Sequence, residues 1–117
     1  MQRELAEEIC SDMNSLVEST VFEIELMNSG RPCLNLNSRI DWEKFPEYAE
    51  KLIHFLGAKV QKKTDSFDVR IWELLIQGEI IRLVFDDFPV MVSLESTNEA
   101  SDEILMGVKS RLEDEAE

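Results

Sequence analysis

Apolar and polar residues alternate along several short stretches of this chain, which predicts a protein rich in β-strands. In TVFEIELM the apolar residues Phe22, Ile24 and Leu26 fall on one side of an extended chain, and two glutamates fall on the other. This alternation is typical of a strand with one buried face. After the turn residues NSGRP, Leu34 and Leu36 continue the alternation, so a second short strand is expected.

Three or four further strands are expected in the second half of the chain. The lysine-rich run 59–63 is suited to an edge strand, because lysines discourage pairing with other chains. The runs 69–76 and 78–85 are rich in β-branched and aromatic residues and are separated by Gln-Gly, which predicts a hairpin. The next strand, 90–95, alternates between an apolar face and a mixed face.

The buried face of 69–76 stays open, because Trp72, Leu74 and Ile76 compete with Ile71 and Leu75. A strand that is apolar on both faces is usually a central strand of its sheet. Elsewhere the period of each element predicts a set of buried side chains: Phe22, Ile24, Leu52, Leu56, Leu83, Phe85, Val92 and Leu94.

Helical spacing of apolar residues predicts three helices. Residues 3–18 form one amphipathic pattern, and FPEYAEKLIHFL forms a stronger one that begins near Phe45. The proline after Phe45 lies too deep for a helix capped by Asp41, so a separate turn is expected before it. The glycine that follows is placed to end this helix in a left-handed conformation. Thr97 or Asn98 is expected to cap the last helix.

These elements predict one α+β domain over residues 1–117. The order is a helix, two strands, a helix, three or four strands and a helix. It favours an antiparallel sheet of about five strands packed against amphipathic helices. The acidic residues 113–117 are expected to form a frayed tail.

The chain is strongly acidic, and the acidity is uneven. Residues 1–63 carry 8 basic and 11 acidic side chains, whereas residues 64–117 carry 4 basic and 14 acidic ones. A net charge of −13 repels nucleic acid and anionic lipid, and it attracts basic proteins. We therefore expect a basic protein partner and no nucleic-acid or membrane partner.

The residues with chemical potential do not form a recognisable catalytic or metal-binding motif. GxGxxG, GxxxxGK[ST], HExxH and CxxC are all absent. The single histidine, His54, falls off the apolar stripe of its helix, and Cys10 and Cys33 are too few for a disulfide framework or a zinc site. We expect a protein that is not an enzyme and uses no cofactor or metal.

The N-terminal sequence MQRELAEEIC is acidic and polar, unlike a signal peptide. No apolar run approaches the ~18 residues that a membrane-spanning helix needs. A cytoplasmic location is therefore expected.

The candidate binding residues centre on Asp86-Asp87-Phe88-Pro89, expected to join two strands as a turn. Adjacent carboxylates in an extended chain point to opposite faces, so a shared catalytic proton is not favoured. An ordinary polar turn and a docking surface for a basic partner both remain open. As a docking surface it would combine acidic residues with an apolar centre, and Trp72 could serve as an anchor or belong to the core. The candidate partner-binding residues are Asp86, Asp87, Phe88, Met91, Glu95, Trp72 and Glu79.

The stretches DWEKFPEYAEKLIHFLGA and DVRIWELLIQGEIIRLVFDDFPVMVSLES, with the amphipathic helix after them, resemble a class of small bacterial proteins. These are the immunity proteins of contact-dependent growth inhibition and related polymorphic toxin systems. The resemblance covers about residues 34–112. It implies a cytoplasmic antidote, itself without catalytic activity, that binds the C-terminal toxin domain of a cognate toxin, commonly a basic nuclease.

The residues agree with that expectation, because aspartates and glutamates can occupy a cationic groove in place of phosphate. We expect a monomer or a weak dimer. The alternative is an acidic dimeric secretion chaperone that holds an unfolded stretch of an exported effector. Such a chaperone needs a large apolar dimer face and grooves for an extended peptide.

Overall fold

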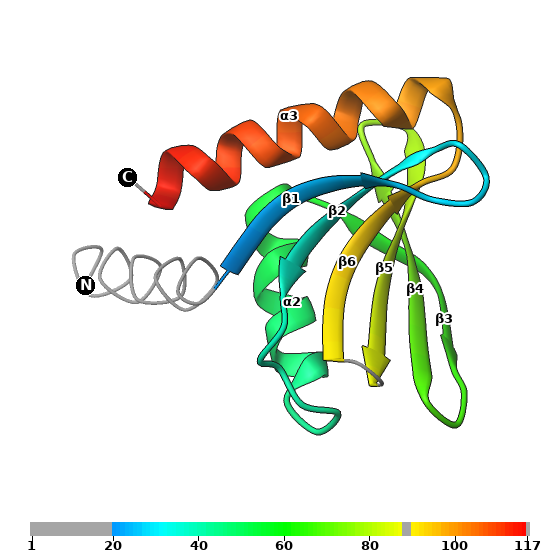
Figure 1. Cartoon of the computed structure of the whole chain (residues 1–117), viewed down its shortest axis with the longest axis vertical. Helices are drawn as coiled ribbons and strands as arrows, with labels where there is room; N and C mark the ends of the chain where they lie inside the picture. Colours follow the sequence, from blue (N-terminus) through cyan, green and yellow to red (C-terminus); the bar gives the residue numbers. More distant parts are fainter. Residues whose placement is uncertain (1–19, 88–89, 117) are drawn as a thin grey trace.

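The structure is a computed structural model that describes residues 20–87 and 90–116, which form a six-stranded antiparallel sheet and two helices (Figure 1). Along the chain the elements are β1 (Thr20–Leu26), β2 (Pro32–Asn37), α2 (Phe45–Leu56), β3 (Lys59–Asp65), β4 (Val69–Ile76), β5 (Glu79–Asp87), β6 (Val90–Ser96) and α3 (Glu99–Ala116). The strand order is β1-β2-β6-β5-β4-β3, so β1 and β3 are the edges. The predicted α+β class is confirmed, with six strands rather than about five. The helix expected over 3–18 lies outside the described residues.

One face of the sheet forms the hydrophobic core. The cross-strand register places Leu34, Leu94, Leu83 and Trp72 side by side on four neighbouring strands. Each of these side chains is at most 2% exposed. The register therefore fixes the orientation of β4, whose residues 72, 74 and 76 face the core.

Helix α2 packs its apolar stripe on this face of the sheet. The ring of Phe45 lies against Trp72 and Phe85, with centroid distances of 5.2 and 5.3 Å. The separate turn before the helix is confirmed, because the Asp41 carboxylate accepts a hydrogen bond from the Lys44 N–H at 2.8 Å. Gly57 ends α2 at φ +66°, the left-handed conformation that a residue without Cβ adopts at low cost.

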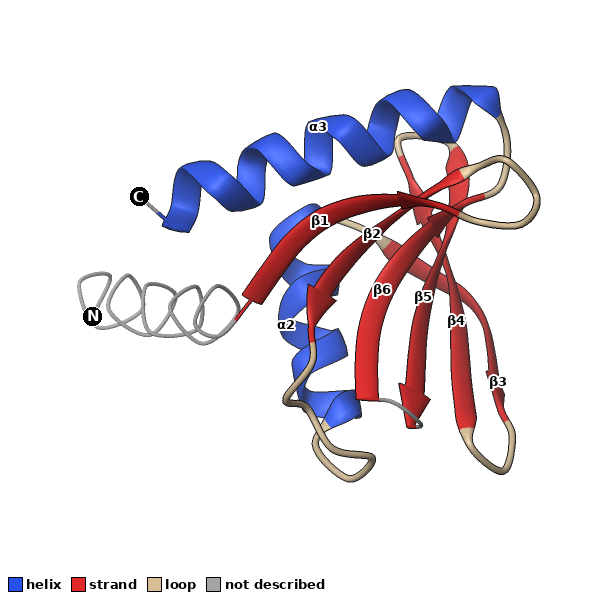
Figure 2. Ribbon diagram, in the orientation of Figure 1, coloured by secondary structure: helices blue, strands red, loops and turns tan. Residues whose placement is uncertain are grey.

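Helix α3 crosses one end of the same face, and α2 lies behind the sheet in the view of Figure 2. Leu105, Val108 and Leu112 join the core that α2 covers, and Arg111 Nη2 donates to the Phe55 carbonyl at 3.0 Å. The expected frayed tail is wrong for 113–116, which continue the helix. Burial of Leu112 and a 2.7 Å ion pair between Lys109 and Glu113 hold this last part of the helix.

Six of the eight residues expected to be buried are at most 7% exposed, and the two in β1 are half-buried. Phe22 and Ile24 lie on an edge strand, which has a neighbour on one side only. Leu26, expected on the buried side of the same strand, is 76% exposed. It is the last residue of β1 and pairs with Pro32 beside the Met27–Arg31 turn.

Among the described residues, no helix is long and apolar enough to cross a membrane.

Candidate partner-binding surface

Asp86 and Asp87 end β5 rather than forming a turn, which corrects the expectation that the strand stops at Phe85. Asp86 pairs with Val69 on β4 and Met91 on β6, and Asp87 pairs with Val90. Their side chains point to opposite faces of the sheet, as the alternation predicted, so they do not form a carboxylate pair that shares a proton. Asp86 is half-exposed and Asp87 is exposed. Phe88 lies outside the described residues.

The turn between β3 and β4 lies beside the end of β5. The Asp87 N–H donates to the Asp68 carbonyl at 3.2 Å, which ties the two chain segments together. Within the turn, the Ser66 N–H and hydroxyl both donate to the Val69 carbonyl, at 2.8 and 3.1 Å. These bonds fix the turn beside the two aspartates of β5.

Phe67 stands at the tip of this turn and is 99% exposed. Asp68 follows Phe67 in the turn, and the backbone of residues 68 and 69 is bonded or paired to Asp87 and Asp86 at the end of β5. Asp65 adds a fourth carboxylate at the end of β3, where it accepts from Trp72 Nε1 at 3.2 Å and lies 4.0 Å from Arg70. We call this set the acidic end of the sheet: Asp65, Phe67, Asp68, Asp86 and Asp87.

The acidic end combines charge with an apolar anchor. A fully exposed aromatic ring has no stabilising contact in the free protein, so its burial by a partner would be favourable. Carboxylates around such a ring would attract a cationic surface and orient it. The arrangement is suited to binding a basic protein.

Of the remaining described site residues, Met91 lies next to the acidic end, because it pairs with Asp86 across β5 and β6. Glu95 lies on the same face of the sheet, opposite the helices, but farther along β6, where it forms an ion pair with Arg82 at 3.4 Å. Trp72 is 2% exposed and belongs to the core, the placement that competed with a binding role. Glu79 begins β5 at the far end of the strand.

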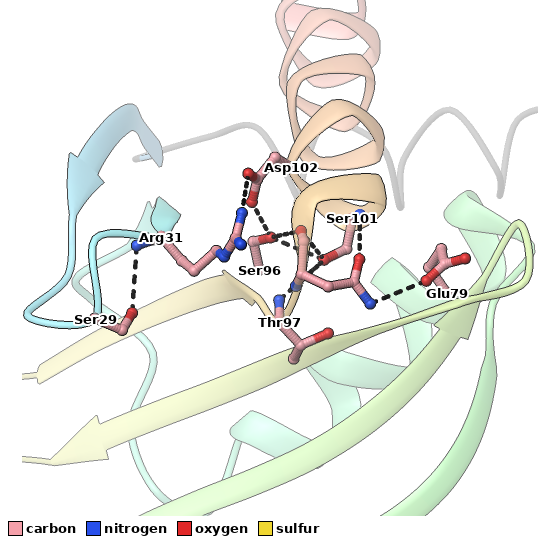
Figure 3. Close-up of polar contacts among 8 residues, drawn as sticks. Ser29, Arg31, Glu79, Ser96, Thr97, Ser101 and Asp102 are labelled. Carbon is pink, nitrogen blue, oxygen red and sulfur yellow. Dashed lines mark hydrogen bonds and ion pairs between the residues drawn. The ribbon is translucent and has the colours of Figure 1, made fainter.

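Glu79 contributes to the cap of α3 (Figure 3). It accepts a hydrogen bond from Asn98 Nδ2 at 3.1 Å, and Asn98 Oδ1 caps the helix by accepting from the Ser101 N–H at 2.8 Å. The fully buried Ser101 hydroxyl accepts from the backbone N–H groups of Thr97 and Asn98, both at 2.9 Å. Asn98 is therefore the cap residue, of the two that the sequence allowed.

The same network anchors the β1–β2 connection to α3. Arg31 Nη1 donates to Asp102 Oδ2 at 2.7 Å, and the Ser96 hydroxyl donates to the other oxygen of that carboxylate. Every polar group in the cluster thus has a partner within the fold. Glu79 and its neighbours serve to hold α3 on the sheet.

Other chemically reactive residues are separated from one another. Within residues 20–87 and 90–116, no group of three or more His, Cys, Asp or Glu side chains is placed to hold a metal ion. His54 is exposed on α2, and Cys33 is buried on β2 as a free thiol. Burial raises the pKa of Cys33, and the carboxylates of Glu25 and Glu95 raise it further. Its thiolate is therefore disfavoured.

One local feature of the sequence points to Phe67, although the alternation of the strands does not. In TDSFDV, four polar residues surround a single aromatic between two apolar strands, which is unusual because an exposed aromatic side chain in a turn gains no burial. The proximity of this turn to Asp87 depends on the pairing of β4 with β5. That pairing fixes the acidic end.

A comparison with protein families matched residues 22–110 to the family described as "Protein of unknown function (DUF3630)". Searches of curated proteins and of solved structures found no significant match. The matched region begins in β1 and ends within α3, so it includes the whole acidic end, all of α2 and α3 as far as residue 110. The chain therefore belongs to the DUF3630 family, whose function is unknown.

Proposed function

We propose that this protein is a non-catalytic binding protein whose acidic end docks on a basic protein domain. The observation that carries the proposal is the 99% exposed ring of Phe67, in a turn whose backbone bonds to the end of β5 that carries Asp86 and Asp87. The resemblance to immunity proteins of contact-dependent growth inhibition supports a specific form. In that form the partner is the toxin domain of a cognate toxin, and binding neutralises it in the cytoplasm.

The two components of the surface would act on different steps of binding. The aspartates would speed association, because complementary charge raises the encounter rate and loses this effect as salt increases. Phe67 would slow dissociation, because a buried aromatic anchor contributes much of the free energy of binding. A cationic groove that normally holds phosphate would thereby be occupied by carboxylates and a ring.

The probe for the test is the C-terminal domain of the large exoprotein that this proposal expects to be encoded beside this chain. Co-expression of the two proteins should restore growth that the toxin domain alone arrests, and the purified pair should bind in a kinetic assay. Asp86→Lys with Asp87→Lys should lower the association rate about 10-fold at low salt and flatten its salt dependence. Phe67→Ala should accelerate dissociation about 30-fold, the effect of losing a contact worth about 2 kcal/mol.

A matched control separates local from general charge effects. Glu50→Lys with Glu103→Lys makes the same change in net charge at two exposed positions on α2 and α3. This control should leave growth rescue and dissociation unchanged. If it slows association as much as the Asp86 and Asp87 reversal does, the acidic end has no special role. If the folded protein neither binds the toxin domain nor restores growth, the immunity function is rejected.

The secretion-chaperone alternative differs in what it binds. A chaperone would hold an extended segment of an effector, so it should bind unfolded peptides from the effector more tightly than a folded basic domain. Comparing the folded toxin domain with overlapping peptides in the same kinetic assay distinguishes the two functions.

A further inference from the structure

The face of the sheet opposite the helices is more apolar than a solvent-facing sheet requires. An antiparallel sheet with one face in water normally places polar residues on that face. Here β4 and β5 place apolar side chains on it, and none of the described helices packs against them. The half-buried apolar residues of this outer face are Val69, Ile71, Leu75, Ile80, Val84 and Met91.

Charged residues form one row across the same face. The register aligns Glu95 on β6, Arg82 on β5, Glu73 on β4 and Lys62 on β3. Their signs alternate from strand to strand. The next row toward the acidic end aligns Ser93, Val84, Ile71 and Thr64, with apolar residues on the two central strands and hydroxyls on either side.

Both rows have the symmetry of a self-complementary surface. A twofold axis parallel to the strands, running between β4 and β5, would place β5 of one copy over β4 of the other. In the charged row, Arg82 would then face Glu73 of the second copy, and Glu95 would face Lys62 of the second copy. Every charge would meet the opposite sign.

The apolar residues obey the same symmetry. Val84 would face Ile71 of the second copy, and Ile80 would face Leu75 of the second copy, because each of these pairs is already in register across β4 and β5. Toward the acidic end, Asp86 would face Val69 of the second copy, at the rim where its carboxylate can stay in water. Two-fold interfaces require this kind of match, in which residue i meets j and j meets i.

We propose that the outer face binds a second copy of this chain in a face-to-face dimer about that twofold axis. This proposal goes beyond the proposed partner binding and uses the centre of the face rather than the turn that carries Phe67. Four strands about 4.8 Å apart and four rows about 7 Å apart give roughly 500 Å² per copy. A total of about 1,000 Å² lies at the lower limit for a specific interface, so the dimer should dissociate at micromolar concentrations.

The test is sedimentation equilibrium of the full chain, from about 5 to 500 µM at about 0.15 M salt, where charges more than ~8 Å apart are screened. The mean mass should rise from 13.5 kDa toward twice that value. Glu73→Arg would place like charges opposite each other twice, and it should raise the dissociation constant at least about 10-fold. Met106→Lys, at an exposed apolar residue on α3, should leave it unchanged.

A charge inversion tests the axis itself. Four substitutions together reverse every charge of the charged row and keep the alternation of sign within each chain: Lys62→Glu, Glu73→Arg, Arg82→Glu and Glu95→Arg. The inverted chain should dimerise with itself, but it should not form mixed dimers with the wild type in native mass spectrometry. Circular dichroism checks the fold. If the inverted chain does not fold, the dimer dissociation constants of Val84→Lys and Met106→Lys are compared instead, and Val84→Lys alone should weaken the dimer. A monomer at all concentrations, mixed dimers at the statistical ratio, or a Val84→Lys variant that still dimerises would overturn the proposal.

Discussion

Replacing Leu83 by alanine should test the assignment of the core face. Leu83 is fully buried on β5, and its register neighbours are Trp72 on β4 and Leu94 on β6. Both neighbours are themselves held in place by paired strands, so the site can collapse only partly. The substitution should therefore cost about 3–4 kcal/mol, near the middle of the range for buried leucines. A domain of this size has roughly 6–15 kcal/mol in total, so the loss would be a large fraction.

Urea unfolding followed by circular dichroism measures this cost. With a slope of about 1–2 kcal/mol per M, the midpoint should fall by roughly 1.5–4 M. Leu26→Ala is the matched control, because it removes the same atoms from a side chain that is 76% exposed, and it should cost less than about 0.5 kcal/mol. If Leu83→Ala costs less than about 1 kcal/mol, or if both variants cost the same, the assignment of the core face is wrong.

Three further predictions concern local structure. Gly57→Ala should cost about 1 kcal/mol from the positive φ alone, since a Cβ there would meet no atom within 4 Å; Gly57→Asn should cost less, and equal losses in urea unfolding would contradict this explanation. Asn98→Ala should lower the free energy of unfolding by about 1 kcal/mol, because it removes the cap of α3. Urea unfolding followed by far-ultraviolet circular dichroism measures this loss, and an unchanged free energy of unfolding would contradict the prediction. Burial raises the pKa of Tyr48 above its usual 10, so the folded state keeps a proton that the unfolded state loses. The stability from this group should be complete below about pH 10 and should fall as the pH rises beyond it; Tyr48→Phe should remove that part of the alkaline loss, and an unchanged slope of unfolding free energy against pH would exclude it.

The sequence predicts best those elements whose apolar residues alternate in a way that allows only one buried face. Val92 and Leu94 alternate with polar neighbours, so one register buries both, and the structure buries both. Gly57 and the separate turn after Asp41 follow from local conformational limits of glycine and proline. Such features depend on neighbours in the chain, and they can be read without the rest of the fold.

Features that depend on strand order could not be predicted in this way. Phe22 and Ile24 have the same alternation as a central strand, but β1 lies at an edge and leaves them half-buried. The two faces of β4 could not be ranked, because the choice depends on which face α2 covers. Phe67 was missed for the same reason, since its position beside Asp87 follows from the β4–β5 pairing.

The distribution of charge shows why net charge alone does not locate a binding surface. Residues 64–117 carry 14 acidic side chains, yet several of them lie beside cations in the fold. Glu95 contacts Arg82 and Glu113 contacts Lys109, so these carboxylates contribute little to the field at a distance. Asp65 at the acidic end likewise lies 4.0 Å from Arg70, so the surface is located instead by the backbone contact between Asp68 and Asp87 and by the exposed ring of Phe67 in the same turn.

The proposed twofold axis is parallel to the strands, so it would direct both acidic ends of a dimer to the same side. A partner that displays two basic domains would then gain avidity without any new contact, because the second domain would bind at a high effective concentration.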